Sequence, residues 1–387
     1  MPSPLSRTLW TTKRGRIAAA AVSATALLVL TSCSLGDTSS TSTSAAAPAA
    51  SAATSKASTA ATGSTAASGG AAAGGDASGA TVGFSAAVLD NPFTVQLVNS
   101  VVAEAGTQGF NMLPPTNAGG DPAKQVSDFD SLVTQGVQGI ITIPADSDAV
   151  ANAVASANAA NIPVVTVDTA ANGGKIYMNV RADNVAMGKS ACEQIGKLTG
   201  DSGTVLELQG DLGTSSGADR HQGFADCMAA SFPNVEIIAK PTDWKSAQAA
   251  DQAQTVLSTT DVNAVFLASD AVMLDSVSNQ MQNLSKWVPT GQDGHIGLVT
   301  IDGGANALAG IRGGQVDAVI SQPINDYATF AVQYLQDAIA GKTQQAGPTD
   351  HNSQIVEYKG NLADLLPSPV VTTANVDDPD LWGNAAS

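Results

Sequence analysis

Residues 139–168 read GIITIPADSDAVANAVASANAANIPVVTVD, and this stretch determines the fold class. Two runs rich in Val and Ile, Gly139–Pro144 and Pro163–Asp168, flank an Ala-rich segment with helical spacing. Asp146 or Ser147 stands where a residue would cap that helix. Continuous Val and Ile strands separated by a helix are typical of a parallel sheet that is covered on both faces.

The same alternation of strand-like and helix-like segments continues along most of the chain after residue 81. Further strand-like runs are Val82–Val88, Phe110–Leu113, Thr204–Gln209, Val235–Ala239, Ala264–Ala268, Gly297–Ile301 and Ala318–Ser321. A body of this length exceeds one typical core. The sequence therefore predicts an α/β protein with two doubly wound parallel-sheet lobes. Residues 81–181 with 323–350 form the first lobe, and residues 182–322 with the tail 351–387 form the second.

The N-terminus has the features of an export signal. Basic residues between Arg7 and Arg16, without an acidic residue, precede the apolar run Ile17–Leu30, which is too short to span a bilayer comfortably. The stretch Leu30-Thr31-Ser32-Cys33 resembles the lipobox of bacterial lipoproteins. This resemblance predicts a signal peptide over residues 1–32 and lipidation of Cys33, which would anchor the protein to the cell membrane. An ordinary secretory signal followed by a chance cysteine is the alternative. Both interpretations place the protein outside the cytoplasm.

Residues 33–80 are expected to consist of the lipidated cysteine, Cys33, followed by a disordered linker. Ala, Ser, Thr or Gly occupies 42 of the 47 positions from 34 to 80, and such a segment buries too little apolar surface to offset the entropy of ordering. As a flexible coil it would extend roughly 35–40 Å. The formal net charge of −17 disfavours nucleic acid and anionic lipid as partners. The lipid anchor is therefore the only membrane contact that we expect.

Two cysteines remain if Cys33 carries a lipid. Cys192 and Cys227 each lie in a predicted helix, and an extracytoplasmic compartment is oxidising. We hypothesise a disulfide between them, with two separate buried thiols as the alternative.

Polar and aromatic residues follow the predicted strands, at the edge where open α/β sheets bind ligands. They are Asn91, Phe93, Asp168, Arg220, Trp244, Ser269, Asp270, Asp302 and Gln322. The hydroxyl groups of sugars and polyols donate and accept hydrogen bonds, so they can pair with the carboxylate, amide, hydroxyl and guanidinium groups of these side chains. The C–H faces of sugars stack on aromatic rings. An Asp or Asn at a strand end is often only a helix cap, so the joint pattern carries more weight than any one residue.

The body from residue 81 to about 345 resembles the ribose-binding group of type I periplasmic sugar-binding proteins, the substrate-binding subunits of ABC importers. The landmarks are Asp90–Phe93, Asp146–Val150, Asn161–Asp168, Glu207–Gly210 with Gly213–Ser215, Ala264–Phe266 and Ile301–Gly303. The resemblance implies a hinge of three crossovers, near Arg181–Asp183, Gln322–Asn325 and Thr349–Asn352. It also implies ligand contacts at Asn91, Phe93, Asp168, Arg220, Trp244, Asp302 and Gln322.

Several positions depart from the ribose-binding pattern. Thr94 stands in place of a second Phe, Thr169 in place of an Arg, Ser269 in place of an Asn, and Ala87 in place of a Ser. Thr94, Thr169, Ser269 and the neighbouring Asp270 are included in the predicted ligand site. Because one guanidinium and one aromatic wall are missing, we expect a roomier pocket, which another monosaccharide or a sugar alcohol fits as well as ribose does.

The leading functional hypothesis is an extracytoplasmic solute-binding lipoprotein. As a monomer, it would deliver a pentose, a hexose or a sugar alcohol to a permease and its ATPase. A module that presents its ligand to a membrane sensor kinase or chemoreceptor is the alternative. No enzymatic activity, cofactor or metal is expected, because His221, His295 and His351 lie outside any nucleophile or metal motif and no phosphate-binding loop is present.

Overall fold

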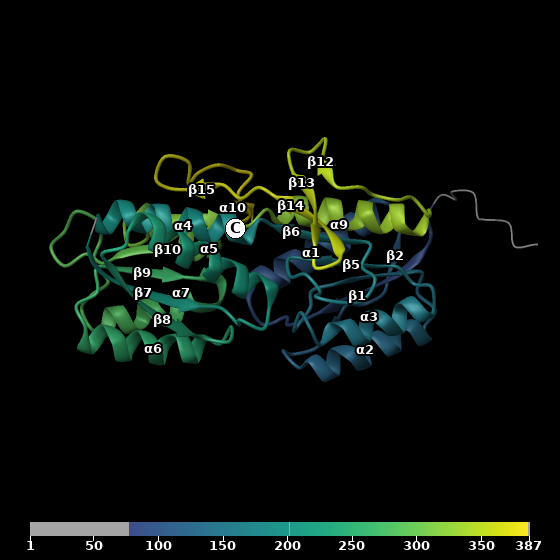
Figure 1. The fold of residues 1–387 in the computed structure, drawn as a ribbon, viewed down its shortest axis with the longest axis horizontal. Coiled ribbons are helices and arrows are strands. Elements are labelled where there is room, and N and C mark those ends of the chain that lie inside the picture. Colours follow the sequence, from purple (N-terminus) through teal and green to yellow (C-terminus); the bar gives the residue numbers. More distant parts are fainter. Residues whose placement is uncertain (1–76, 201, 386–387) are drawn as a thin grey trace, which may run out of the picture. The chain divides into compact units, whose positions relative to one another are not determined.

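Two sheets organise residues 77–200 and 202–385, which are the residues that the computed structural model describes (Figure 1). The sheet of the first lobe has nine strands in the order β12-β13-β14-β6-β5-β4-β1-β2, with β3 also paired to β1. Its strands are β1 (Thr81–Ala86), β2 (Asn111–Met112), β3 (Thr116–Asn117), β4 (Gly139–Thr142), β5 (Val164–Val167), β6 (Met178–Ala182), β12 (Gly347–Pro348), β13 (Gln354–Tyr358) and β14 (Asn361–Leu366). Its helices are α1 (Pro92–Thr107), α2 (Pro122–Thr134), α3 (Val150–Ala159) and α9 (Ile324–Ile339).

The sheet of the second lobe has six strands in the order β15-β11-β10-β9-β7-β8. These are β7 (Gly203–Gln209), β8 (Val235–Pro241), β9 (Ala264–Leu267), β10 (Gly297–Asp302), β11 (Ala318–Ser321) and β15 (Val370–Val371). The helices of this lobe are α4 (Asn184–Thr199), α5 (Ser215–Ser231), α6 (Ser246–Thr259), α7 (Asp270–Asn283), α8 (Ala305–Gly313) and α10 (Trp382–Ala385). All pairs from β7 to β11 are parallel, as the sequence predicts.

Both sheets are covered on both faces, because neighbouring residues of one strand enter different cores. Val164 and Val165 of β5 are fully buried in separate apolar clusters, and so are Val265 and Phe266 of β9. The cluster that contains Val165 also contains Phe266, so this core is continuous through both lobes. The two-lobed α/β prediction is confirmed, and the shared core ties the lobes together on one side.

The third crossover and the tail differ from expectation. The chain passes between the lobes after β6, after β11 and, at Pro367–Pro369, after β14. We expected the last crossover at Thr349–Asn352, but that turn connects β12 to β13 inside the first sheet. Assigning all of 351–387 to the second lobe was also wrong, because β14 pairs in parallel with β6 of the first sheet. The reason is physical: β6 is a buried strand, and β14 supplies the hydrogen bonds that its outer edge needs.

The end of the expected linker is packed rather than free. Ala77 and Ala80 are each only 5 % exposed and belong to the continuous core. The backbone N–H of Gly79 donates a hydrogen bond to the carbonyl of Gly109 at 2.8 Å. The folded body therefore begins at or before residue 77, and the linker prediction is wrong for residues 77–80. The remainder of the linker, the signal segment and Cys33 lie outside the described residues.

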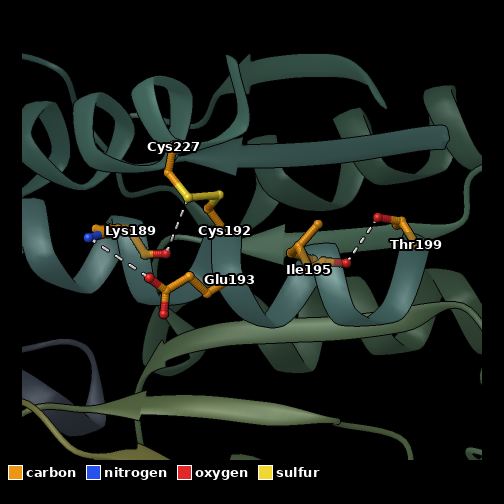
Figure 2. The surroundings of a disulfide bond; sticks show 6 residues. All are labelled: Lys189, Cys192, Glu193, Ile195, Thr199 and Cys227. Carbon is orange, nitrogen blue, oxygen red and sulfur yellow. Dashed lines mark hydrogen bonds and ion pairs between the residues drawn. A yellow bond between two sulfur atoms is a disulfide. The ribbon is translucent and has the colours of Figure 1, made fainter. Parts of the chain in front are cut away.

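Helices α4 and α5 pack side by side in the second lobe, and a disulfide joins Cys192 of α4 to Cys227 of α5 (Figure 2). The structure therefore agrees with the disulfide hypothesis and not with two separate thiols. None of the helices in the described parts of the chain is both long and apolar enough to cross a bilayer.

Candidate functional site

A cavity of about 950 Å³ lies between the two lobes. Its walls come from residues that follow β1, β4 and β5 in the first lobe and β7 to β10 in the second. These are the carboxyl ends of parallel strands, the edge at which open α/β sheets bind ligands. The expected ligand residues that line it are Asn91, Phe93, Thr94, Asp168, Thr169, Arg220, Trp244, Ser269 and Asp302, whereas Asp270 and Gln322 do not.

The first lobe contributes the start of α1. Asn91 caps this helix, because its Oδ1 accepts a hydrogen bond from the backbone N–H of Thr94 at 3.0 Å, and Pro92 occupies the first turn. Phe93 is 7 % exposed and adds an aromatic residue to the cavity wall. Asn91 is therefore both a helix cap and a cavity residue. A polar residue that follows a strand can thus cap a helix and line the ligand cavity at the same time.

The end of β5 contributes Asp168 and Thr169. Asp168 has a left-handed backbone with φ of 65°, and Thr169 Oγ1 donates a hydrogen bond to its carboxylate at 3.0 Å. Burial raises the pKa of Asp168, and the positive charge of Arg220 opposes that rise. The cavity thus holds a desolvated carboxyl group, for which hydrogen-bond donors on a ligand would be favourable.

Arg220 of α5 is a buried cation in the cavity wall. It is 3 % exposed, its Nε donates to Asn184 Oδ1 at 2.8 Å, and its Nη1 donates to the carbonyl of Ala268 at 2.7 Å. Nη1 also lies 3.6 Å from Asp302 Oδ1. These contacts hold the guanidinium beside the carboxyl group of Asp302, and its positive charge opposes the rise in the pKa of both Asp168 and Asp302.

Asp302 ends β10 and has a strained backbone, with φ of 116°. Its carboxylate accepts hydrogen bonds from Ser269 Oγ and, at 3.3 Å, from Gln322 Nε2. Burial raises the pKa of Asp302 to about 6, although Arg220 acts in the opposite direction. Ser269 and Gln322 therefore keep this carboxylate in one orientation beside the cavity.

Asp270 and Gln322 act behind the cavity wall. The two carboxylate oxygens of Asp270 accept the backbone N–H groups of Gly303 and Gly304 at 2.8 and 3.0 Å, next to the start of α8. Gln322 Nε2 lies 3.5 Å from Asp168 Oδ1, and its Oε1 accepts the hydroxyl of Tyr327 at 2.8 Å. Both residues position the wall rather than form it.

Trp244 provides a second aromatic surface. Its indole N–H donates to Thr214 Oγ1 at 3.1 Å, and its ring stands 5.7 Å from the guanidinium carbon of Arg220. Gly210 lies so close to this ring that an added Cβ would approach it to 2.0 Å. The site prediction did not include Thr214 and Ser216, which also line the cavity, although Gly213–Ser215 already stood out in the sequence.

The arrangement suits a small polyhydroxylated molecule. Carboxylates accept hydrogen bonds from hydroxyl groups, the guanidinium and the hydroxyl side chains donate them, and two aromatic rings offer apolar faces. Within 77–200 and 202–385, no group of His, Cys, Asp and Glu side chains is arranged to hold a metal ion.

Comparisons with known proteins agree with this geometry. Residues 82–343 match the family model described as a periplasmic binding protein domain. The ribose import binding protein of Escherichia coli K12 is 31 % identical over 267 residues, which is 69 % of this chain and 87 % of that protein. A xylitol-binding protein of Mycolicibacterium smegmatis is 30 % identical over 57 % of this chain and 64 % of its own length. A glycerol-bound ABC transporter solute-binding protein from Mycobacterium smegmatis has a TM-score of 0.67 at 25 % identity, covering 77 % of this chain and 96 % of that one.

Proposed function

Because the chain belongs to the periplasmic binding protein domain family, we propose that it captures a monosaccharide or sugar alcohol between its lobes and delivers it to the permease of an ABC importer. Members of this family are substrate-binding proteins and not enzymes, so the chain is not assigned a reaction. The observation that carries the proposal is the cavity between the lobes, which is lined by Asp168, Arg220 and Asp302 together with Phe93.

The ligand class follows from what the walls offer. The relatives include a ribose import binding protein and a xylitol-binding protein, so both cyclic and open-chain polyols are represented. In this chain the short side chains of Thr94 and Thr169 line the cavity, where a ring and a guanidinium are expected in a ribose binder. We therefore propose that the site accepts a sugar or polyol other than ribose at least as well as ribose.

Calorimetric titration with D-ribose, D-allose, xylitol and myo-inositol tests this proposal. Any of these four compounds that binds should stabilise the folded protein by about 2.7 kcal/mol at a free concentration 100 times its Kd, which is visible as a thermal shift. Arg220→Met should abolish most of the binding because it removes the buried cation. Lys124→Met, on the exposed ion pair with Asp128, is the matched control and should bind normally. No heat and no thermal shift with any of the four compounds would count against the proposal.

The anchoring proposal rests on the sequence alone. We propose that residues 1–32 are removed, that Cys33 carries lipid, and that residues up to 76 form a tether that keeps a monomeric receptor near the permease and its ATPase. The family supports an extracytoplasmic location. Cys33→Ser should move the protein from the membrane fraction to the soluble extracytoplasmic fraction. If the unaltered protein is already soluble there, the anchor proposal is wrong.

A further inference from the structure

The chain continues past the residues that match the family, and its last described segment contacts two residues of the cavity wall from behind. After β15 it packs on the second lobe, where Arg312 of α8 holds it. Arg312 Nε donates to Asp377 Oδ1 at 2.8 Å, and Nη2 donates to the carbonyl of Val376 at 3.0 Å and to Asn384 Oδ1 at 2.9 Å. This anchoring places the short helix α10 where the lobes meet (Figure 1).

Trp382, the first residue of α10, contacts one cavity residue from each lobe. Its indole N–H donates to the backbone carbonyl of Asp302 at 2.6 Å, and its ring meets that of Phe93 edge to face, with 6.2 Å between the centroids. Trp382 is 4 % exposed and does not itself line the cavity. It therefore lies directly behind a carboxylate residue of the second lobe and an aromatic residue of the first.

The backbone that Trp382 supports is the strained end of β10. Asp302 has φ of 116° and Gly303 has φ of 92°, so this turn needs external hydrogen bonds to keep its shape. The carbonyl of Asp302 accepts three of them, from the Trp382 indole at 2.6 Å, from the backbone N–H of Gln322 at 2.9 Å and from Ser321 Oγ at 3.5 Å.

One glycine lets the tail approach this turn closely. A Cβ on Gly383 would come within 2.3 Å of the Gly303 carbonyl oxygen. The tail and the turn are thus fitted to each other along their backbones, and the fit fixes where Trp382 can lie.

We propose that Trp382 is a positioning residue of the ligand site, which holds the Asp302 turn through its indole N–H and braces the Phe93 ring of the opposite lobe. The role in ligand binding rests on the proposed function of the cavity. The effect on the Asp302 turn and on α1 does not, because it concerns the protein without a bound sugar.

Two variants separate the contributions of the indole. Trp382→Phe keeps a ring against Phe93 and removes the hydrogen bond to Asp302, whereas Trp382→Ala removes both. Trp287→Ala is the matched control, because Trp287 is a partly buried tryptophan of the second lobe that does not line the cavity. All three are compared with the unaltered protein by hydrogen–deuterium exchange without ligand and by calorimetry with D-ribose, D-allose, xylitol and myo-inositol.

For Trp382→Phe we expect faster amide exchange in residues 302–304 and 322, and roughly tenfold weaker binding of whichever compound the unaltered protein binds. That fold-change corresponds to the loss of one hydrogen bond of about 1.4 kcal/mol. In Trp382→Ala faster exchange should extend to residues 93–98, with a larger loss of affinity. Trp287→Ala should change neither the amide exchange rates of these segments nor the binding affinity.

Unchanged exchange at 302–304 in Trp382→Phe would overturn the proposal, whatever the effect on thermal stability. If Trp382→Ala does not fold, Trp382→Phe alone decides. If the unaltered protein binds none of the four compounds, the proposed function fails while the exchange comparison still tests the positioning role.

Discussion

The buried Asp302 carboxyl shows how a single residue serves binding at the expense of stability. Without a ligand it is desolvated, and its neighbours Ser269, Gln322 and Arg220 offset only part of that penalty, which is why its pKa stays raised at about 6. A sugar hydroxyl that donates to the carboxylate would supply a missing partner. The residue therefore favours the liganded state over the empty one.

This reasoning predicts a pH dependence of stability. The folded-state pKa of Asp302 lies above the unfolded value, so the folded protein binds this proton more tightly than the unfolded chain does. The stability that protonation of Asp302 supplies is complete below pH 4 and is lost as the pH rises through 6. Relative to Asp302→Asn, the free energy of unfolding of the unliganded protein should fall between pH 4 and 7 by up to about 3 kcal/mol. Urea titrations at several pH values measure this difference. Asp251→Asn, at an exposed position of α6, is the control. Parallel curves for the protein and Asp302→Asn would contradict the prediction.

Residue types at strand ends predict much of the cavity wall, but not which residues stand behind it. Asp302 and Asp270 both follow predicted strands, and only contacts with Gly303 and Gly304 show that Asp270 holds a turn. Trp382 has no sequence signal at all as a site residue. Its role depends on the path of the tail, which packs against residues about 80 and 290 positions earlier.

At the scale of elements, the strands that sequence analysis found are those with continuous Val and Ile. It missed β6, in which polar Asn179 and Arg181 interrupt the apolar residues although every position is buried. Asn179 accepts a hydrogen bond from Thr166 and donates one to the carbonyl of Leu362, while Arg181 pairs with Asp219 at 2.7 Å. These partners lie up to 183 positions away. A buried strand whose polar residues find their partners elsewhere in the chain looks like a surface segment in the sequence.

The disulfide that joins α4 to α5 should stabilise the fold. The disulfide closes a loop with a sequence separation of 35 residues, which restricts the unfolded chain. Replacing both Cys192 and Cys227 with Ala should lower the free energy of unfolding by about 3–4 kcal/mol. Reductant should destabilise the unaltered protein similarly and leave the double variant unchanged. If reductant acts equally on both proteins, the disulfide is not the source of the effect.

At the scale of the whole molecule, the lobes are joined by more than the three crossovers. Ser147 Oγ accepts the backbone N–H of Ser215 at 2.9 Å, and Ser215 Oγ accepts that of Ala170 at 2.8 Å. Thr169 and Ser216, which both line the cavity, place their hydroxyl oxygens 3.1 Å apart. Lobes that separate at the hinge would lose these bonds. They therefore favour the closed arrangement in which the cavity walls face each other.

The double variant Ser147→Ala and Ser215→Ala should therefore shift the molecule toward an open form. Each lost hydrogen bond is worth about 1 kcal/mol, so we expect roughly 30-fold weaker binding of whichever tested sugar or polyol binds, mainly through faster dissociation. Small-angle scattering of the unliganded variant should give a larger radius of gyration than the unaltered protein. Ser127→Ala with Ser131→Ala, on the exposed face of α2, removes two serine hydroxyls within one lobe and should change neither quantity. An unchanged radius together with unchanged affinity would mean that the continuous core, rather than these hydrogen bonds, holds the lobes closed.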